Sequence, residues 1–189
     1  MKKEKAKNGR PNGTKKHGQI RYLTDNELQE FFSQTTKNLK HELIFKLSYF
    51  YGCRAAEVSE LRLENINLEE KTITIIAKKK GDVRIYSIPE TIFSLLEKYL
   101  TERGQIQNQF LFPHRFKKLE PITTVGIGKL FQFYAKRANI RAHSPHDLRH
   151  SIAIYMVKQG NSIIQIQKWL RQKSAGSAQK YIGLNPDLP

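Results

Sequence analysis

Cysteine is almost absent from this chain, which carries a single thiol, Cys53, among 189 residues. One cysteine excludes an internal disulfide and any zinc site built from several cysteines. Cys53 stands in an apolar and aromatic stretch, where a free cysteine usually behaves as a small hydrophobe. We therefore expect it to pack in the core rather than to carry chemistry.

Long apolar runs are also lacking. No stretch approaches the roughly 20 apolar residues that a membrane-spanning helix needs. The basic N-terminus lacks the apolar segment of a secretory signal. These absences predict a soluble, cytoplasmic protein with no membrane partner, and the length suffices for one domain with a sizeable core.

Acidic residues are scarce relative to basic ones. The chain has 17 Asp and Glu against 33 Lys and Arg, so its formal net charge is +16. Such an excess favours a polyanionic partner. Nucleic acid is the leading candidate, and an anionic membrane surface is the weaker one.

The first 20 residues have seven basic side chains against Glu4 alone, and few apolar residues. A segment of this composition cannot bury enough apolar surface to order itself. We expect residues 1–20 to be a flexible basic arm or linker, although a solubilising tail without specific contacts would have the same composition. Residues 21–189 then form the folded domain.

Hydrophobic periodicity from residue 21 onward predicts a mainly helical α+β domain with a small three-stranded antiparallel sheet. Thr24 and Glu27 have the spacing of a capping box, and Ser144-Pro145 is a typical helix start. The expected helices are one opening at residue 24, then 39–51, 55–61, 89–102, 123–138, 144–160, 162–170 and 174–181. The expected strands are 66–68, 72–76 and 83–88, with a hairpin turn at 78–82.

The most informative motif is His146-Asp147-Leu148-Arg149-His150, with Tyr181 farther along the chain. His146 and Arg149 are three residues apart and share one helix face. An arginine fork suits a phosphate, and a histidine exchanges protons near neutral pH. A tyrosine beside them is a candidate nucleophile toward phosphorus, although a tyrosine on a C-terminal helix is most often a packing residue.

A zinc site is the rival interpretation of this motif. His146 and His150 are four residues apart, as in the zinc motif H-E-x-x-H, but Asp147 stands in place of the glutamate. No third ligand follows at a familiar spacing. We therefore expect no metal.

Two further segments could hold phosphate. Arg54 lies at a predicted helix N-terminus, where backbone N–H groups favour an anion, and Glu57 one turn later can orient it. An exposed Arg54–Glu57 ion pair of little energetic value is the plainer interpretation. Lys78, Lys79 and Lys80 occupy the hairpin turn, where a run of lysines is usually only solvated.

Together these motifs resemble the catalytic domain of the tyrosine recombinases, the phage integrase family, over residues 21 to about 184. The segment 52–57 resembles the first arginine box of the family, and the strand ending at Lys78 resembles the strand that carries the catalytic lysine. Residues 87–89 resemble the strand-to-proline step beyond that hairpin. The 146–150 motif resembles the second box, and Tyr181 stands 32 residues after Arg149, where the nucleophile belongs.

The chain departs from the family pattern at two places. Gln172 stands nine residues before Tyr181, where the family usually has histidine or tryptophan after a Leu-Gly pair; here Leu170 and Arg171 precede it. Glutamine can still donate a hydrogen bond to phosphate, but without charge. Trp169 could substitute, although its position suggests core. The family's N-terminal core-binding domain has no counterpart in these residues.

The resemblance implies a site-specific recombinase or integrase of the DNA breaking-rejoining fold that works through a 3′-phosphotyrosyl intermediate without a cofactor. Tyr181 would be the nucleophile and His146 its proton acceptor. Arg54, Arg149 and Gln172 would hold the phosphate, and Lys78 would protonate the leaving 5′ oxygen. Glu57 and His150 would support them.

The partner implied is double-stranded DNA, bound by a protein that is monomeric in solution and tetrameric on paired sites. Lys79, Lys80, Arg84 and the N-terminal arm would contact the DNA backbone. A DNA-binding protein of the same fold that no longer recombines, and a relaxase resembling type IB topoisomerases, remain alternatives.

Overall fold

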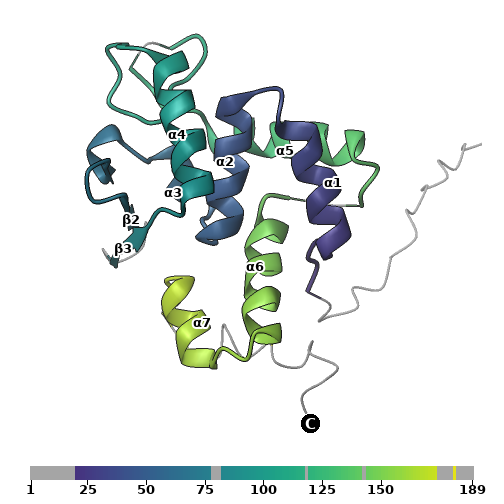
Figure 1. Ribbon diagram of the computed structural model, residues 1–189. Coiled ribbons are helices and arrows are strands. Elements are labelled where there is room, and N and C mark those ends of the chain that lie inside the picture. The colour runs from purple at the N-terminus through teal and green to yellow at the C-terminus, as the bar shows by residue number, and fades with distance from the viewer. Residues whose placement is uncertain (1–19, 78–81, 118, 142–143, 174–180, 182–189) are drawn as a thin grey trace, which may run out of the picture.

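The computed structural model describes residues 20–77, 82–117, 119–141, 144–173 and 181. Within these ranges it contains seven α-helices and a three-stranded antiparallel sheet, which confirms the predicted α+β class (Figure 1). The helices are α1 (Asp25–Thr35), α2 (Leu39–Phe50), α3 (Ala55–Ser59), α4 (Glu90–Arg103), α5 (Thr124–Arg137), α6 (His146–Lys158) and α7 (Ile163–Trp169). None of these described helices is long and apolar enough to cross a membrane.

The helix starts follow their capping signals. The Thr24 hydroxyl accepts a hydrogen bond from the Glu27 backbone N–H, and the Glu27 carboxylate accepts one from the Thr24 N–H, as the capping box predicts. Helix α6 begins at His146, two residues into the expected range of 144–160, and Pro145 rather than Ser144 is the cap residue. The Ser144 hydroxyl accepts from the His146 N–H at 3.3 Å. The motif at 146–150 therefore occupies the first turns of α6.

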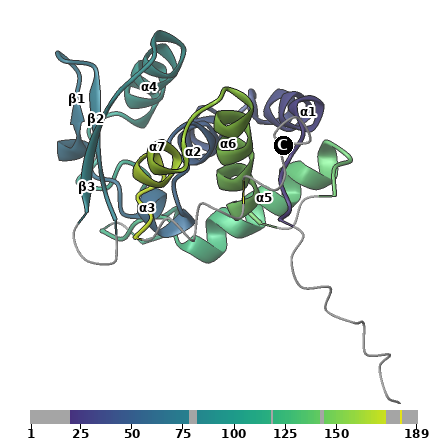
Figure 2. The same cartoon turned by 90° about the horizontal axis from the view of Figure 1, so that it is seen from below.

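The sheet has the strand order β1 (Ile66–Asn67), β2 (Thr72–Ile76) and β3 (Val83–Ser87), and it lies beside α4 at one side of the molecule (Figure 2). Ile73 pairs with Tyr86 across β2 and β3, and both side chains face the core. Strand β1 begins where predicted but ends one residue early, because the chain turns from Leu68 onward and the Glu70 backbone N–H donates to the Asn67 side chain. The predicted turn at 78–82 and the predicted helix at 174–181 fall almost entirely outside the described residues.

The core is built around α2, which contacts α1, α4, α5 and α6. Phe31 of α1, Phe45 of α2 and Phe131 of α5 are fully buried, and their ring centroids lie 5.1 to 6.0 Å apart. A second, smaller core joins α6, α7 and Tyr181. These two cores hold the C-terminal end of α2 and the start of α6 in place.

Removal of one ring from the aromatic cluster should destabilise the domain. We expect Phe131→Ala to lower the free energy of unfolding by about 3–5 kcal/mol, because it leaves a cavity among buried rings. Val125→Ala on the same helix is the control, since Val125 is exposed and should change stability by less than about 0.5 kcal/mol. Urea unfolding followed by circular dichroism measures both, and equal stabilities for the two variants would contradict this account.

Candidate active site

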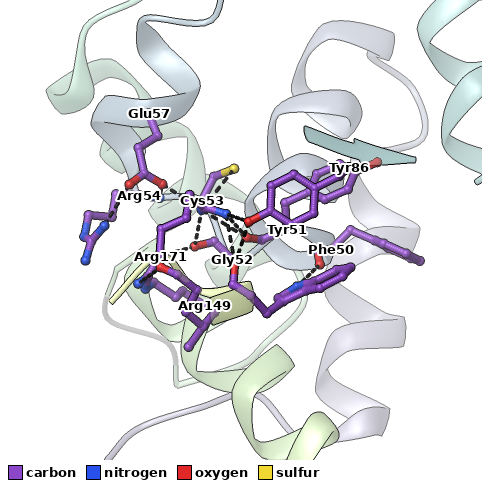
Figure 3. Close-up of polar contacts among 11 residues, drawn as sticks. Phe50, Tyr51, Gly52, Cys53, Arg54, Glu57, Tyr86, Arg149 and Arg171 are labelled. Carbon is purple, nitrogen blue, oxygen red and sulfur yellow. Dashed lines mark hydrogen bonds and ion pairs between the residues drawn. The ribbon is translucent and has the colours of Figure 1, made fainter. Parts of the chain in front are cut away.

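Three segments far apart in the sequence meet at the C-terminal end of α2: the turn at 51–57, the first turns of α6, and the end of α7 (Figure 3). Gly52 makes this approach possible. Its φ of +55° is in the left-handed region, and a Cβ there would collide with the Leu170 side chain. Gly52, which follows the end of α2, therefore lets the end of α7 pack against the turn.

Arg54 and Glu57 are joined as predicted. Arg54 Nη1 lies 2.7 Å from Glu57 Oε1, and the Arg54 backbone N–H donates to Glu57 Oε2 at 2.9 Å. The plainer interpretation, an exposed ion pair, is wrong because the Glu57 side chain is only 1% exposed, although that of Arg54 is 42% exposed. Burial alone would raise the pKa of the Glu57 carboxyl, but Arg171 and Arg54 hold it below its ordinary value.

Arg149 is buried beneath this turn. Its guanidinium donates to the backbone carbonyls of Gly52 and Leu170, so it ties the turn to the end of α7. Burial, and then the nearby charge of Arg54, lower the pKa of Arg149 to about 10. An arginine held by neutral carbonyls keeps its positive charge available to an anion.

Arg171 is the residue of this cluster that the sequence did not single out. It is buried, and its Nη2 donates to Glu57 Oε2 at 2.9 Å. It also donates to the Tyr51 carbonyl and the Tyr86 hydroxyl. No local pattern marks a residue whose partner is 114 positions away. Arg54 and Arg171 thus share one carboxylate and Arg149 lies nearby, which leaves a net positive site.

Tyr181 lies inside the protein. Its side chain is fully buried, and its hydroxyl lies 2.8 Å from His150 Nδ1. Burial raises the pKa of Tyr181, while Arg149, a hydrogen bond from the Gln172 side chain and Arg54 act in the opposite direction. The phenol is therefore neutral near pH 7.

The two histidines of α6 are in contact, with ring centroids 4.7 Å apart. His146 is exposed and His150 is half-buried. The structure thus places His150, predicted as a support, against the tyrosine hydroxyl, and His146 beside it.

Gln172 and Trp169 occupy different environments. The Gln172 side chain hydrogen-bonds Tyr181, and its Oε1 is buried without a hydrogen-bond partner. Trp169 packs against Tyr51 and Tyr86 and donates its indole N–H to the Phe50 carbonyl, so its predicted place in the core is confirmed. Gln172 is therefore the one that reaches the tyrosine.

The predicted DNA contacts are only partly described. Lys78, Lys79 and Lys80 lie outside the described residues. The Arg84 side chain on β3 is half-exposed, and its Nε lies 3.5 Å from Asp82 Oδ1. Among the described ranges, no group of three or more His, Cys, Asp or Glu side chains could hold a metal ion.

Comparison with known proteins adds a family match. The model of the phage integrase family matches residues 21–187. Tyrosine recombinase XerA of Pyrococcus furiosus is 29% identical over 160 residues, which cover 84% of this chain and 56% of that protein. Tyrosine recombinase XerD of Staphylococcus haemolyticus is 29% identical over 152 residues, covering 77% and 51%. The chain thus spans about half the length of these curated relatives.

Solved structures have the same fold. A crystal structure of XerA recombinase superposes with a TM-score of 0.77 at 25% identity, over 88% of this chain and 61% of that one. XerH site-specific recombinase in a pre-cleavage complex with its difH substrate gives a TM-score of 0.73 at 26% identity, over 85% and 50%. The catalytic domain of bacteriophage HP1 integrase gives 0.67 at 18% identity, over 89% and 90%.

The burial of Cys53 predicts an inert thiol next to the site. Burial raises the pKa of Cys53 to about 12, so only roughly one thiol in ten thousand is ionised at pH 8. We expect iodoacetamide to leave the folded protein unlabelled at pH 8 and to label it within minutes in 8 M urea. Mass spectrometry of the intact chain measures this, and rapid labelling of the folded protein would contradict the predicted burial.

Proposed function

Since the chain belongs to the phage integrase family, we propose that it is the catalytic domain of a site-specific DNA recombinase. It would cleave and rejoin DNA strands through a 3′-phosphotyrosyl intermediate. The observation that supports this most is the place of Tyr181: its hydroxyl lies 2.8 Å from His150 Nδ1, on the helix that also carries Arg149, and the charges of Arg149 and Arg54 and the Gln172 side chain act on it. A phosphate bound by these groups would lie beside a nucleophile.

Charge stabilisation is the main contribution that we assign to the arginines. Arg54 is half-exposed and can reach a phosphate at the surface, while Arg149 lies buried behind it. The site holds more positive than negative charge and is shielded from water, where oriented donors are most effective. Negative charge that builds on the phosphoryl oxygens is therefore stabilised without metal chemistry being needed.

In the proposed reaction the Tyr181 oxygen attacks phosphorus and loses its proton. The bond to the 5′ oxygen breaks, and Lys78 protonates that oxygen to give a free 5′-hydroxyl. Attack by a 5′-hydroxyl of another strand on the phosphotyrosine restores the phosphodiester and the tyrosine, so exchange needs no ATP. Lys78 keeps this role as a prediction from the sequence.

The tyrosine must become accessible before it can react, because its side chain is fully buried. Leaving this position would break its contact with His150. His146 is exposed and in contact with His150, so we retain it as the proton acceptor once Tyr181 is uncovered. A histidine acceptor suits reaction near neutral pH.

Double-stranded DNA is the proposed substrate, and a tetramer on paired sites is the proposed assembly. The net charge of +16 favours a polyanion, and Lys79, Lys80, Arg84 and residues 1–20 would contact its backbone. XerH, a relative of similar fold, is described in complex with its difH substrate.

A DNA-binding protein that no longer recombines is the second candidate. The observation in its favour is Gln172, which is neutral where the family usually has histidine. Glutamine can donate a hydrogen bond to phosphate oxygen but cannot add charge. Recombination and simple binding are separated by whether a covalent protein–DNA link forms.

We expect the protein to form a covalent complex with nicked suicide duplexes, tested on a pool with randomised half-sites. Tyr181→Phe should abolish that complex, because phenylalanine has no oxygen to attack phosphorus. Tyr155→Phe, an exposed tyrosine of α6, is the matched control and should behave as the parent. Denaturing gels of end-labelled DNA detect the complex. If the parent forms none, the second candidate is favoured. Relaxation of supercoiled plasmid that lacks a specific site would favour a relaxase.

DNA binding should depend steeply on salt, with log affinity falling by about 0.9 per neutralised phosphate for each unit of log salt concentration. Arg84→Gln should reduce this slope by about one if Arg84 contacts a phosphate. Lys158→Gln, at the opposite end of α6 from His146, is the control and should leave the slope unchanged. Fluorescence anisotropy at 50 to 300 mM salt measures it, and equal slopes for both variants would exclude Arg84 from the contact.

A further inference from the structure

Arg171 is a buried arginine that does not itself contact phosphate in the proposed chemistry. Its side chain is 0% exposed and that of Glu57 is 1% exposed, and Arg171 Nη2 lies 2.9 Å from Glu57 Oε2. Two charges removed from water are tolerated when they are paired and hydrogen-bonded. The other partners of Arg171 include the carbonyls of Tyr51 and Gly52, at 3.1 and 3.3 Å. Both terminal nitrogens of the guanidinium thus donate to the turn that follows α2, whereas Nε is buried without a hydrogen-bond partner (Figure 3).

The backbone at Arg171 is strained. Its φ of +53° is in the left-handed region, which glycine enters without steric conflict and arginine does not. A residue held in such a conformation is a reason to look for a functional constraint. Here the conformation accompanies a guanidinium directed at Glu57, while the next residue, Gln172, hydrogen-bonds Tyr181.

Glu57 connects Arg171 to the proposed phosphate site. Oε1 of Glu57 accepts from Arg54 Nη1 at 2.7 Å, and Oε2 accepts from both the Arg54 backbone N–H and Arg171, each at 2.9 Å. Without Arg171 the buried carboxylate would lose its most buried cationic partner. Its remaining cation partner would be Arg54, whose side chain is 42% exposed.

We propose that Arg171 is a positioning residue, which acts through Glu57 to hold Arg54 where it binds the scissile phosphate. The inference rests on the proposed function, because it requires Arg54 to contact DNA. The competing explanation is that Arg171 only stabilises the fold. It predicts that a variant loses stability while its folded fraction cleaves and binds DNA as the parent does.

Arg103 provides a matched control for a purely structural role. It lies at the end of α4, and its guanidinium donates to the backbone carbonyls of Gly104, Asn108 and Phe110. It is thus a backbone-anchoring arginine outside the proposed site. Arg103→Met should reduce stability while the folded fraction keeps the cleavage rate of the parent.

The first experiment measures covalent cleavage of the suicide duplex at saturating DNA, per folded protein. We expect Arg171→Gly to lower the rate constant at least tenfold although glycine relieves the backbone strain, and Arg171→Lys to recover part of it by restoring the cation. Arg103→Met should stay within twofold of the parent. Urea unfolding followed by circular dichroism gives the folded fraction of each variant, because Arg171 contacts the Cys53 thiol and its loss would alter labelling of that thiol without unfolding. A folded Arg171→Gly that cleaves within twofold of the parent would overturn the proposal, and so would an Arg171→Lys that cleaves no faster than Arg171→Gly.

The pH dependence of the cleavage rate separates the two explanations, because a purely structural role of Arg171 would leave it unchanged. Glu57 faces Arg54 and Cys53 from its own turn, Arg149 from α6, and Arg171. Loss of Arg171 raises the pKa of Glu57, so the carboxylate protonates at a higher pH and releases Arg54. Protonation of His146, the proposed proton acceptor, gives an acidic fall in cleavage rate that all these variants share. The additional fall caused by protonation of Glu57 should shift to higher pH in Arg171→Gly and return with Arg171→Lys. It should be absent when Glu57→Gln is added. Coincident profiles for parent and Arg171→Gly would contradict the proposal.

DNA binding tests the inference independently of the chemistry. Arg171→Gly should weaken duplex binding in the parent background but add less than a twofold effect in an Arg54→Gln background, because the two side chains act through one contact. Equal effects in both backgrounds would overturn the positioning role. If the parent binds duplex but never becomes covalently linked, the proposed recombinase function is wrong, while the comparison of the two backgrounds still decides the role of Arg171. If the parent binds no duplex, both the proposed function and the positioning role are contradicted.

Discussion

The buried carboxylate of Glu57 joins the helical core to the candidate site. It accepts hydrogen bonds from Arg54 on the surface side and from Arg171 on the interior side. Because a buried charge is stable only while it is compensated, the turn after α2 and the end of α7 cannot move independently. Arg149 reinforces this link through the carbonyls of Gly52 and Leu170.

The balance of charge around that carboxylate explains how a stable core can also attract an anion. Arg54 and Arg171 bond to Glu57, whereas Arg149 is satisfied by neutral carbonyls rather than by a carboxylate. Its pKa of about 10 reflects burial and the repulsion from Arg54. A phosphate would relieve this repulsion, so the packing that stabilises the fold also prepares the site for its proposed substrate.

Local patterns made much of the fold predictable. The capping box at Thr24, the proline step before α6 and the glycine after α2 act within a few residues of themselves, and the helices begin and end close to the expected positions. The pairing of Arg54 with Glu57, three residues apart, was predictable for the same reason. The end of β1 was less predictable, because the chain turns at Leu68, which the apolar pattern assigned to the strand.

The sequence by itself determined the family, the α+β class, the order of the arginine, histidine and tyrosine motifs, and a burial of Cys53 that the structure confirms. Only the tertiary structure decided that Glu57 is interior, that Arg171 is its partner, and that Tyr181 is covered and lies against His150. Glu57 and Arg171 are 114 residues apart. Spacing along a chain identifies neighbours within a helix turn, whereas contacts between the ends of α2 and α7 depend on how two separate cores pack.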